Sequence, residues 1–168
     1  MTGPVGGSAE PNARDTTSGF ILPPGGGRPI DLGAFRMTVK ATAEQTGGAF
    51  TLLEADEPPG FGPPMHIHHD CAEAFYVLDG EYLIFLGDRE EACPAGSFIY
   101  IPARTPHGFR VRNVASRKLN VYLPAAMVGY FDDLSNAIRV GEADPDVLGE
   151  IAVRHSVEMI GPVPEGYL

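Results

Sequence analysis

The sequence has few cationic side chains and few thiols. Its 168 residues include 12 lysines and arginines against 22 aspartates and glutamates, a formal net charge of −10 at pH 7. Because such an acidic surface repels nucleic acid and anionic membranes, we expect neither as a partner. The two cysteines, Cys71 and Cys93, are more typical of free thiols than of a disulfide framework.

Long apolar runs are also lacking. No stretch approaches the roughly 18 residues that a transmembrane helix needs. The N-terminal region lacks a basic segment followed by an apolar core, which a secretory signal would show. We therefore expect a cytoplasmic protein with no membrane span. The length predicts about one domain, which is large enough to fold without a disulfide or a metal.

Glycine and proline, by contrast, are abundant, with 21 and 16 residues. Together with short runs of valine, isoleucine, phenylalanine and threonine, they favour an all-β fold. Residues 1–33 are especially rich in both, which excludes a helix or a central strand there and predicts an N-terminal arm. The apolar run Phe20, Ile21 and Leu22 within it favours an arm that packs on another surface.

Residues 34–124 show a repeated strand pattern. Phe35, Met37 and Val39 alternate with polar residues, which is typical of a half-buried strand. Further strands are predicted at residues 49–54, 66–69, 73–78, 82–86, 97–101, 107–114 and 118–123. Short strands at this density predict a small barrel or jelly roll. Residues 125–168 change to a helical pattern and predict short helices that pack on the barrel, one of them capped by Asp144 ahead of Pro145.

Three histidines are spaced so that they converge inside this barrel. His66 and His68 lie two residues apart, so a strand places both on one face. His107 alternates with Phe109 and Val111, which puts it on an apolar, inward face. A lone inward histidine is usually a hydrogen-bonded core residue, but three of them need a common explanation.

Glu73 provides a carboxylate near these histidines. It stands at an odd offset from His68, so a straight strand would point it the other way, and a bend over residues 69–72 would turn it inwards. Four buried polar groups are costly without compensation, which a cation supplies directly. Three imidazoles and one carboxylate suit one divalent ion of Fe, Ni, Mn, Co, Cu or Zn. His69 and His155 are expected to lie outside this site.

Two motifs here resemble those of the cupin family. The first cupin motif is matched at each of its defined positions, as Gly60-x5-His66-x-His68-x4-Glu73-x6-Gly80. The second is matched at Gly96, Pro102 and His107. It departs at Arg104 and Val111, where the family has glycine and asparagine. We therefore expect the turn before His107 to differ in shape, with the Arg104 cation at its rim.

The resemblance is to small actinobacterial cupins related to quercetin dioxygenase. It implies an all-β double-stranded β-helix, or jelly-roll barrel, with one divalent metal bound by His66, His68, Glu73 and His107. It also implies a metal-dependent dioxygenase in which Glu73 is both ligand and general base, and in which an enolisable, flavonol-like aromatic reacts with O2. Because small cupins often pair their barrels, a homodimer is expected.

The predicted lining supports an apolar or aromatic substrate, because Phe50, Phe75 and Phe109 are all expected to point inwards. Two other functions remain open: a redox-neutral metallo-cupin such as an isomerase or decarboxylase, and a non-catalytic module that binds a metal or small molecule. The redox-neutral reactions usually need inward cationic side chains. The chain has only two lysines, Lys40 and Lys118, and the barrel arginines alternate outwards, which counts against that class.

Overall fold

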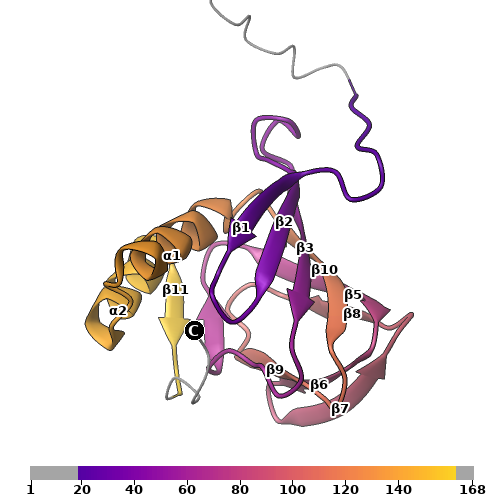
Figure 1. Cartoon of the computed structure of the whole chain (residues 1–168). Helices are drawn as coiled ribbons and strands as arrows, with labels where there is room; N and C mark the ends of the chain where they lie inside the picture. Colours follow the sequence, from indigo (N-terminus) through magenta and orange to yellow (C-terminus); the bar gives the residue numbers. More distant parts are fainter. Residues whose placement is uncertain (1–18, 162–168) are drawn as a thin grey trace, which may run out of the picture.

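Two antiparallel sheets face each other in the computed structural model, of which we describe residues 19–161 (Figure 1). The first sheet has the strand order β1-β2-β3-β10-β5-β8, and the second has the order β11-β4-β9-β6-β7. This architecture confirms the predicted all-β jelly-roll class. Residues 1–18 of the predicted arm and residues 162–168 of the predicted C-terminal segment lie outside the described residues.

The first sheet comprises β1 (Arg28–Asp31), β2 (Arg36–Ala41), β3 (Thr51–Glu57), β10 (Ser116–Leu123), β5 (Ala72–Asp79) and β8 (Phe98–Ile101). The second comprises β11 (Val157–Met159), β4 (His66–His68), β9 (His107–Val111), β6 (Glu81–Leu86) and β7 (Arg89–Pro94). Most of the predicted strands are therefore present, with shifts of one to three residues at their ends.

Alternation places the inner face correctly in β2, where Met37 and Val39 are buried and Lys40 lies on the other face. It fails in β10. There, Lys118 and Asn120 are buried between the sheets, whereas the apolar residues between and beside them are only partly buried. The inner face of the first sheet thus carries polar groups that hydrophobicity alone would have placed outside.

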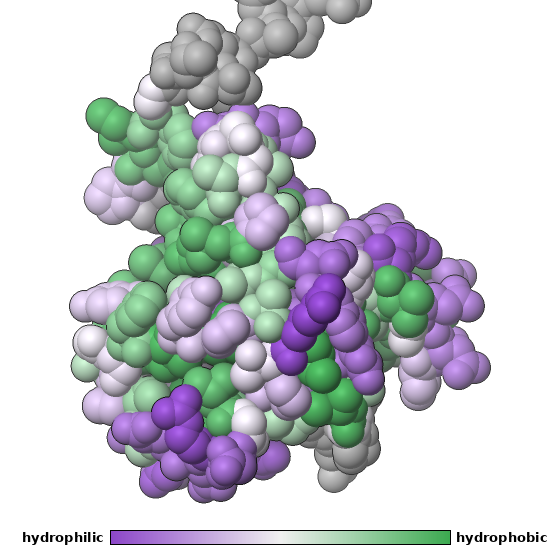
Figure 2. All heavy atoms as spheres, turned by 180° about the vertical axis from the view of Figure 1, so that it is seen from behind, coloured by the Kyte–Doolittle hydropathy of each residue, from purple (hydrophilic) through white to green (hydrophobic). Residues whose placement is uncertain are grey.

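The outer face of the first sheet is apolar at the end formed by β10, β5 and β8. It exposes Tyr76, Phe98, Tyr100 and Leu123, and we call these four residues the outer apolar face. Tyr76 is paired with Phe98 across β5 and β8. The surface seen from behind carries broad apolar areas beside and below the N-terminal segment (Figure 2).

Three strands were not predicted, and one of them moves a boundary. β1 pairs with β2 inside the segment assigned to the arm, so the sheet starts at Arg28 and the predicted boundary after residue 33 is wrong. As expected for a segment containing Pro29, β1 is an edge strand. β7 is an exposed, charged edge strand, and β11 has only three residues, so neither shows a usable alternation.

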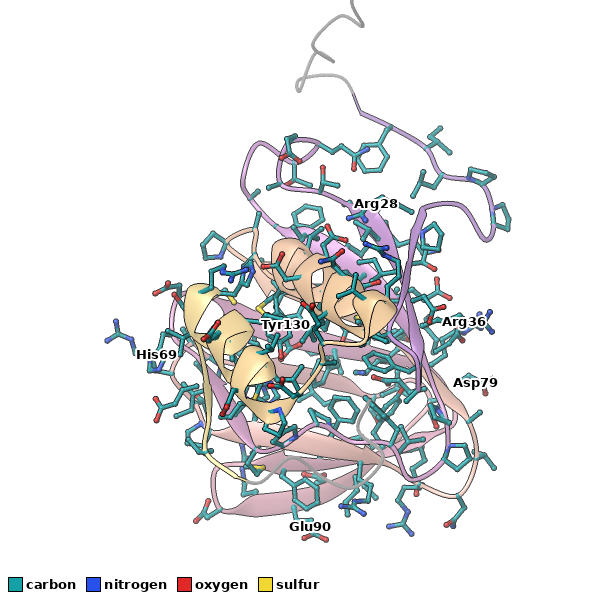
Figure 3. All side chains as sticks on the ribbon, turned by 60° about the vertical axis from the view of Figure 1, so that its left-hand side comes forward. Arg28, Arg36, His69, Asp79, Glu90 and Tyr130 are labelled. Carbon is teal, nitrogen blue, oxygen red and sulfur yellow. The ribbon has the colours of Figure 1, made fainter. Side chains whose placement is uncertain are left out.

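The predicted helices are α1 (Val128–Val140) and α2 (Pro145–Arg154). The Asp144 side chain caps α2 by accepting hydrogen bonds from two backbone N–H groups, as expected. The helices pack beside β11, and Tyr130 of α1 reaches the interior (Figures 1 and 3). Neither helix has the length and apolar character needed to cross a membrane. Cys71 and Cys93 are free, as predicted.

Candidate metal centre

The two sheets together position the four residues of the predicted site. His66 and His68 lie on β4, and His107 lies on β9 directly opposite His66. After His68 the chain leaves the second sheet and enters the first as β5, where Glu73 faces the interior. Because the chain changes sheets between His68 and Glu73, the inward and outward alternation of side chains does not continue across this segment. Glu73 can therefore face the histidines although it lies five residues after His68.

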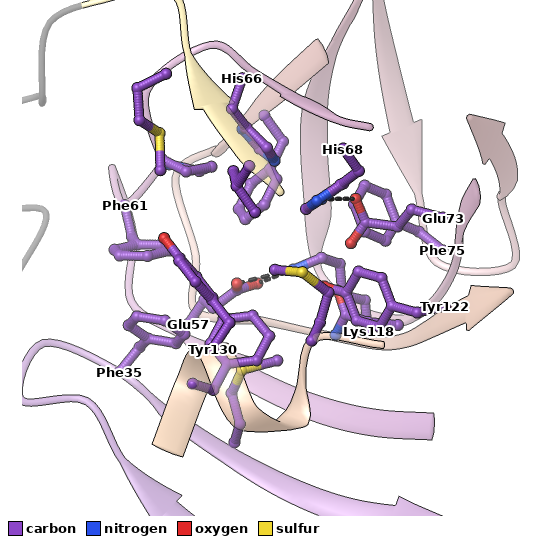
Figure 4. Close-up of a pocket in the computed structure, with 18 residues that line it drawn as sticks. Phe35, Glu57, Phe61, His66, His68, Glu73, Phe75, Lys118, Tyr122 and Tyr130 are labelled. Atoms are coloured by element: carbon purple, nitrogen blue, oxygen red, sulfur yellow. Dashed lines mark hydrogen bonds and ion pairs between the residues drawn. The ribbon is translucent and has the colours of Figure 1, made fainter. Parts of the chain in front are cut away.

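The side chains of His66, His68, Glu73 and His107 form one buried cluster, of which Figure 4 shows His66, His68 and Glu73. Their candidate ligand atoms all lie within 4.8 Å of one another. Glu73 Oε2 lies 3.0 Å from His107 Nε2 and 3.3 Å from His68 Nε2. The structure therefore brings together all four residues that the sequence singled out.

Backbone carbonyls orient two of the three imidazoles. His66 Nδ1 is 2.8 Å from the Pro64 carbonyl oxygen, and His107 Nδ1 is 2.8 Å from the Thr105 carbonyl oxygen. If Nδ1 carries the proton that it donates to the carbonyl, the Nε2 lone pair is left for the centre of the cluster. Metal-binding histidines commonly receive this kind of support.

His68 provides a direct test of whether a metal fits. Both of its ring nitrogens are buried and neither makes a hydrogen bond among the described residues, although Nε2 lies 3.3 Å from Glu73 Oε2. Leaving buried polar atoms unpartnered is costly, and a cation at the centre of the cluster would be a partner for Nε2. With three imidazoles and a carboxylate as donors, the cluster is compatible with a single divalent metal ion.

The electrostatics of the apo cluster also favour a cation. Burial, and then repulsion from His107 and His68, lower the pKa of His66 to about 3. Burial alone would raise the pKa of Glu73, but the hydrogen bond with His107 and the attraction from His68 and His107 hold it well below its usual range. The cluster therefore offers a neutral imidazole and an ionised carboxylate, which are the forms that bind metals.

The two other histidines lie away from the cluster, as predicted. His69 points away from the body of the molecule (Figure 3), and its Nε2 lies 2.9 Å from Glu158 Oε2. His155 Nε2 lies 2.8 Å from Asp133 Oδ2, also outside the sheets. Each has a carboxylate partner of its own and needs no metal.

The turn before His107 has Arg104 in a left-handed conformation. Arg104 has a φ of 66°, which is the left-handed conformation that a glycine adopts readily. Its backbone N–H donates to the His68 carbonyl oxygen over 2.7 Å, linking the turn to β4. The backbone thus keeps a conformation suited to glycine, while the exposed Arg104 side chain does not line the cavity described next.

A cavity between the sheets is lined by three of the four cluster residues, His66, His68 and Glu73 (Figure 4). Phe75 and Phe109 line it, as predicted. The prediction for Phe50 is wrong, because Phe50 lies in a separate surface hollow with Phe20 and Leu22. The reason is the phase of β3: its inward row begins at Thr51, so Phe50 falls on the outer row.

The cavity also contains a charged pair that the sequence analysis missed. Lys118 Nζ lies 2.8 and 2.7 Å from the two carboxylate oxygens of Glu57, and Tyr82 donates a hydrogen bond to Glu57 over 2.7 Å. Lys118 is only 1% exposed. The argument that this chain lacks an inward cationic side chain is therefore wrong. The sequence does contain a signal for this: Lys118, Asn120 and Tyr122 occupy every second position, so a strand places all three on one face.

Comparison with known proteins defines the class. Residues 53–121 match the cupin domain. A curated relative, quercetin 2,3-dioxygenase of Bacillus subtilis, is 26% identical over 133 residues, which cover 79% of this chain and 40% of that protein. An uncharacterized protein of Methanocaldococcus jannaschii is 32% identical over 71 residues, covering 42% of this chain and 55% of that one. The chain thus spans about half or less of these relatives.

Solved structures share the fold. An RmlC-like cupin from Shewanella frigidimarina aligns with a TM-score of 0.56 at 16% identity, covering 64% of this chain and 93% of that one. KdgF from a Halomonas species aligns with a TM-score of 0.50 at 16% identity, covering 55% and 82%. Residues 53–121 thus match the cupin domain, the chain carries a four-residue candidate metal site, and it is similar to a quercetin 2,3-dioxygenase.

Proposed function

We propose that this cupin is a metal-dependent dioxygenase acting on a small enolisable molecule. The observation that carries the proposal is the cluster of three histidines and Glu73, of which His66, His68 and Glu73 line a cavity with aromatic walls. The similarity to quercetin 2,3-dioxygenase supports the same reaction class. In the proposed reaction the electron-rich enolate supplies the electrons that reduce O2, a carbon–carbon bond of the substrate is cleaved, and both oxygen atoms enter the products, so no external reductant is required.

The residues of the chain have distinct tasks in this reaction. His66, His68, His107 and Glu73 would hold the divalent ion, which supplies Lewis acidity toward an acidic enol or phenol oxygen. Glu73 takes the proton of that oxygen as general base. Phe75 and Phe109 provide apolar walls that exclude water from the electron-rich enolate.

The size of the cavity limits the substrate. Its volume is about 50 Å³, which is less than the roughly 150 Å³ that holds a benzene molecule in an engineered protein cavity. A flavonol therefore does not fit between the side chains as they lie. Met37, Met127 and Met159 line the cavity, and their unbranched side chains are the walls best able to move. We propose a substrate smaller than a flavonol, admitted by movement of these methionines.

A redox-neutral reaction is the second candidate, and Lys118 is the observation that favours it. Isomerases and decarboxylases acting on polar substrates use inward charged groups, and Lys118 and Glu57 provide them. The pair is internally neutralised, however, and three aromatic rings surround the ammonium. These contacts suit a structural or recognition role better than proton transfer, so the dioxygenase remains our proposal.

Oxygen consumption tests the proposed function. Protein purified without oxygen and loaded separately with Fe, Ni, Mn or Co should consume O2 with at least one member of a panel of small enolisable molecules. The matched control is the same protein stripped of metal. Conversion of a substrate without O2 uptake would support the redox-neutral candidate. Metal binding with no turnover across the panel would support a non-catalytic binding module.

We also propose that a second copy of the chain covers the outer apolar face. Aromatic side chains are enriched at protein interfaces, and Phe98 and Tyr100 are 66% and 54% exposed on the edge strand β8. The segment 1–18 has only Met1 and Val5 as large apolar residues, so it is a poor cover for this face. A twofold contact would use the same face on both copies.

Changing this face should change the oligomeric state. We expect wild-type protein to sediment as a dimer and the double variant Phe98→Glu, Tyr100→Glu to sediment as a monomer, because each contact would bury unpaired carboxylates. Val153→Glu is the control, since Val153 is 77% exposed on α2, away from this face. A monomeric wild type, or a double variant that remains dimeric, would refute the interface.

A further inference from the structure

The charged pair in the cavity is separate from the metal cluster and is held in place by its own contacts. Glu57 ends β3 and Lys118 lies on the neighbouring β10, where both side chains face the cavity (Figure 4). Both are buried, with side-chain exposures of 2% and 1%. Tyr82 reaches the same carboxylate from β6 of the second sheet, so both sheets fix the position of Glu57.

Most of the donor capacity of Lys118 is already used. Two of its three N–H groups are directed to Glu57 Oε1 and Oε2. The ammonium also lies 4.0 Å from the centroid of the Phe109 ring, with the Tyr82 and Phe75 rings at 4.9 and 5.1 Å. Its charge is therefore balanced by the carboxylate and by the aromatic faces. This arrangement does not favour binding a substrate anion.

Glu57, in contrast, has acceptor capacity to spare. An ionised carboxylate offers about four acceptor sites. Lys118 uses two of them and Tyr82 uses one, on Oε2, so these three hydrogen bonds leave one of the four sites, on Oε1. A buried acceptor site at a cavity wall is ready for a donor. The donor that matches the aromatic surroundings and the small volume is a hydroxyl group.

We propose that Glu57 determines substrate specificity by accepting a hydrogen bond from a hydroxyl group at the end of the substrate remote from His66, His68, Glu73 and His107. Lys118 and Tyr82 are positioning residues that hold the carboxylate for this contact. The inference deepens the proposed function: it rests on the metal site and narrows the substrate class to small hydroxylated molecules with a second, metal-binding oxygen.

Matched hydroxamates test this subsite without turnover. The probes are acetohydroxamate with its hydroxylated analogue glycolohydroxamate, and propionohydroxamate with 3-hydroxypropionohydroxamate, titrated calorimetrically into protein loaded with Co(II). The hydroxamate group binds the metal, and the two lengths sample the distance to Glu57. We expect the hydroxylated member of at least one pair to bind about tenfold more tightly, which is typical of a hydrogen bond to a charged group.

The double variant Glu57→Leu, Lys118→Met tests whether Glu57 causes the preference for the hydroxylated probes. Replacing a buried ion pair with apolar residues of similar volume is often tolerated, whereas removing one partner strands a charge. We expect the double variant to keep its Co(II) content and its affinity for the unhydroxylated probes, and to lose the preference for the hydroxyl group. A preference that survives in this variant would exclude Glu57 as the acceptor.

The wild-type titrations test the proposal even if the double variant does not fold. Equal affinities within both pairs, or no binding of any hydroxamate to the Co(II)-loaded protein, would overturn the subsite. Failure of the proposed dioxygenase is a different result: hydroxyl preference with no O2 uptake on any substrate. In that case the subsite stands and the reaction class is wrong.

Discussion

Replacing both His66 and His68 with alanine should abolish stoichiometric metal binding. The change removes two of the four candidate ligands, including the one whose nitrogens are buried without a hydrogen-bond partner. A divalent transition ion left with one imidazole and one carboxylate loses most of its affinity, because its remaining positions must be filled by water. Elemental analysis of protein purified in parallel would measure the metal per chain.

The double variant His69→Ala, His155→Ala is the matched control, because it also removes two histidines. Both lie outside the cluster, each with its own carboxylate partner. We expect this control to retain one metal per chain. Stoichiometric metal in the His66, His68 variant would place the site elsewhere and refute the assignment. Loss of metal in both variants would point to general unfolding, which circular dichroism would detect.

The second large effect is expected from Glu73→Gln. Glutamine keeps the size of the side chain and one oxygen for the metal, but it cannot take a proton from the substrate. Positioned proton transfer typically contributes 10²–10⁴-fold to a rate, so we expect turnover to fall by about 10² or more once metal occupancy is restored. Substrate affinity should change less, because the metal and the aromatic walls remain.

Steady-state O2 uptake by metal-replete protein measures this effect, with metal content determined on the same sample. Glu158→Gln is the control: this surface carboxylate pairs with His69 and takes no part in the cluster. Wild-type turnover in metal-replete Glu73→Gln would show that Glu73 is a ligand only. If turnover fell only in proportion to the metal lost, Glu73 would likewise be a ligand and not a base.

The metal cluster could be predicted because the spacing of its histidines does not depend on where each predicted strand begins or ends. His66 and His68 share a face in any strand, and His107 lies in a clear apolar alternation. Glu73 required a bend, which the structure provides by moving the chain from β4 in one sheet to β5 in the other. Short-range periodicity was sufficient for the histidines, and the family motif supplied the carboxylate.

The other residues of the cavity could not be predicted from hydrophobic periodicity. Some of its inward positions hold polar residues, whereas strands usually place apolar residues inward. In β10 the inward positions hold Lys118 and Asn120, while Leu119 and Val121 lie on the other face. Tertiary contacts with Glu57 and with three aromatic rings make burial of Lys118 tolerable. The prediction that Phe50 points inwards failed for a related reason: which residues of β3 face inwards depends on where the strand begins.

Anomalous diffraction from crystals of the metal-loaded protein would test the central claim most directly. Data collected on both sides of the absorption edge of the loaded metal locate it independently of any activity. The account predicts one peak per chain among His66, His68, Glu73 and His107, with metal–nitrogen distances of about 2.1 Å for a zinc-like ion. A stoichiometrically loaded protein whose peak lies anywhere else would contradict it.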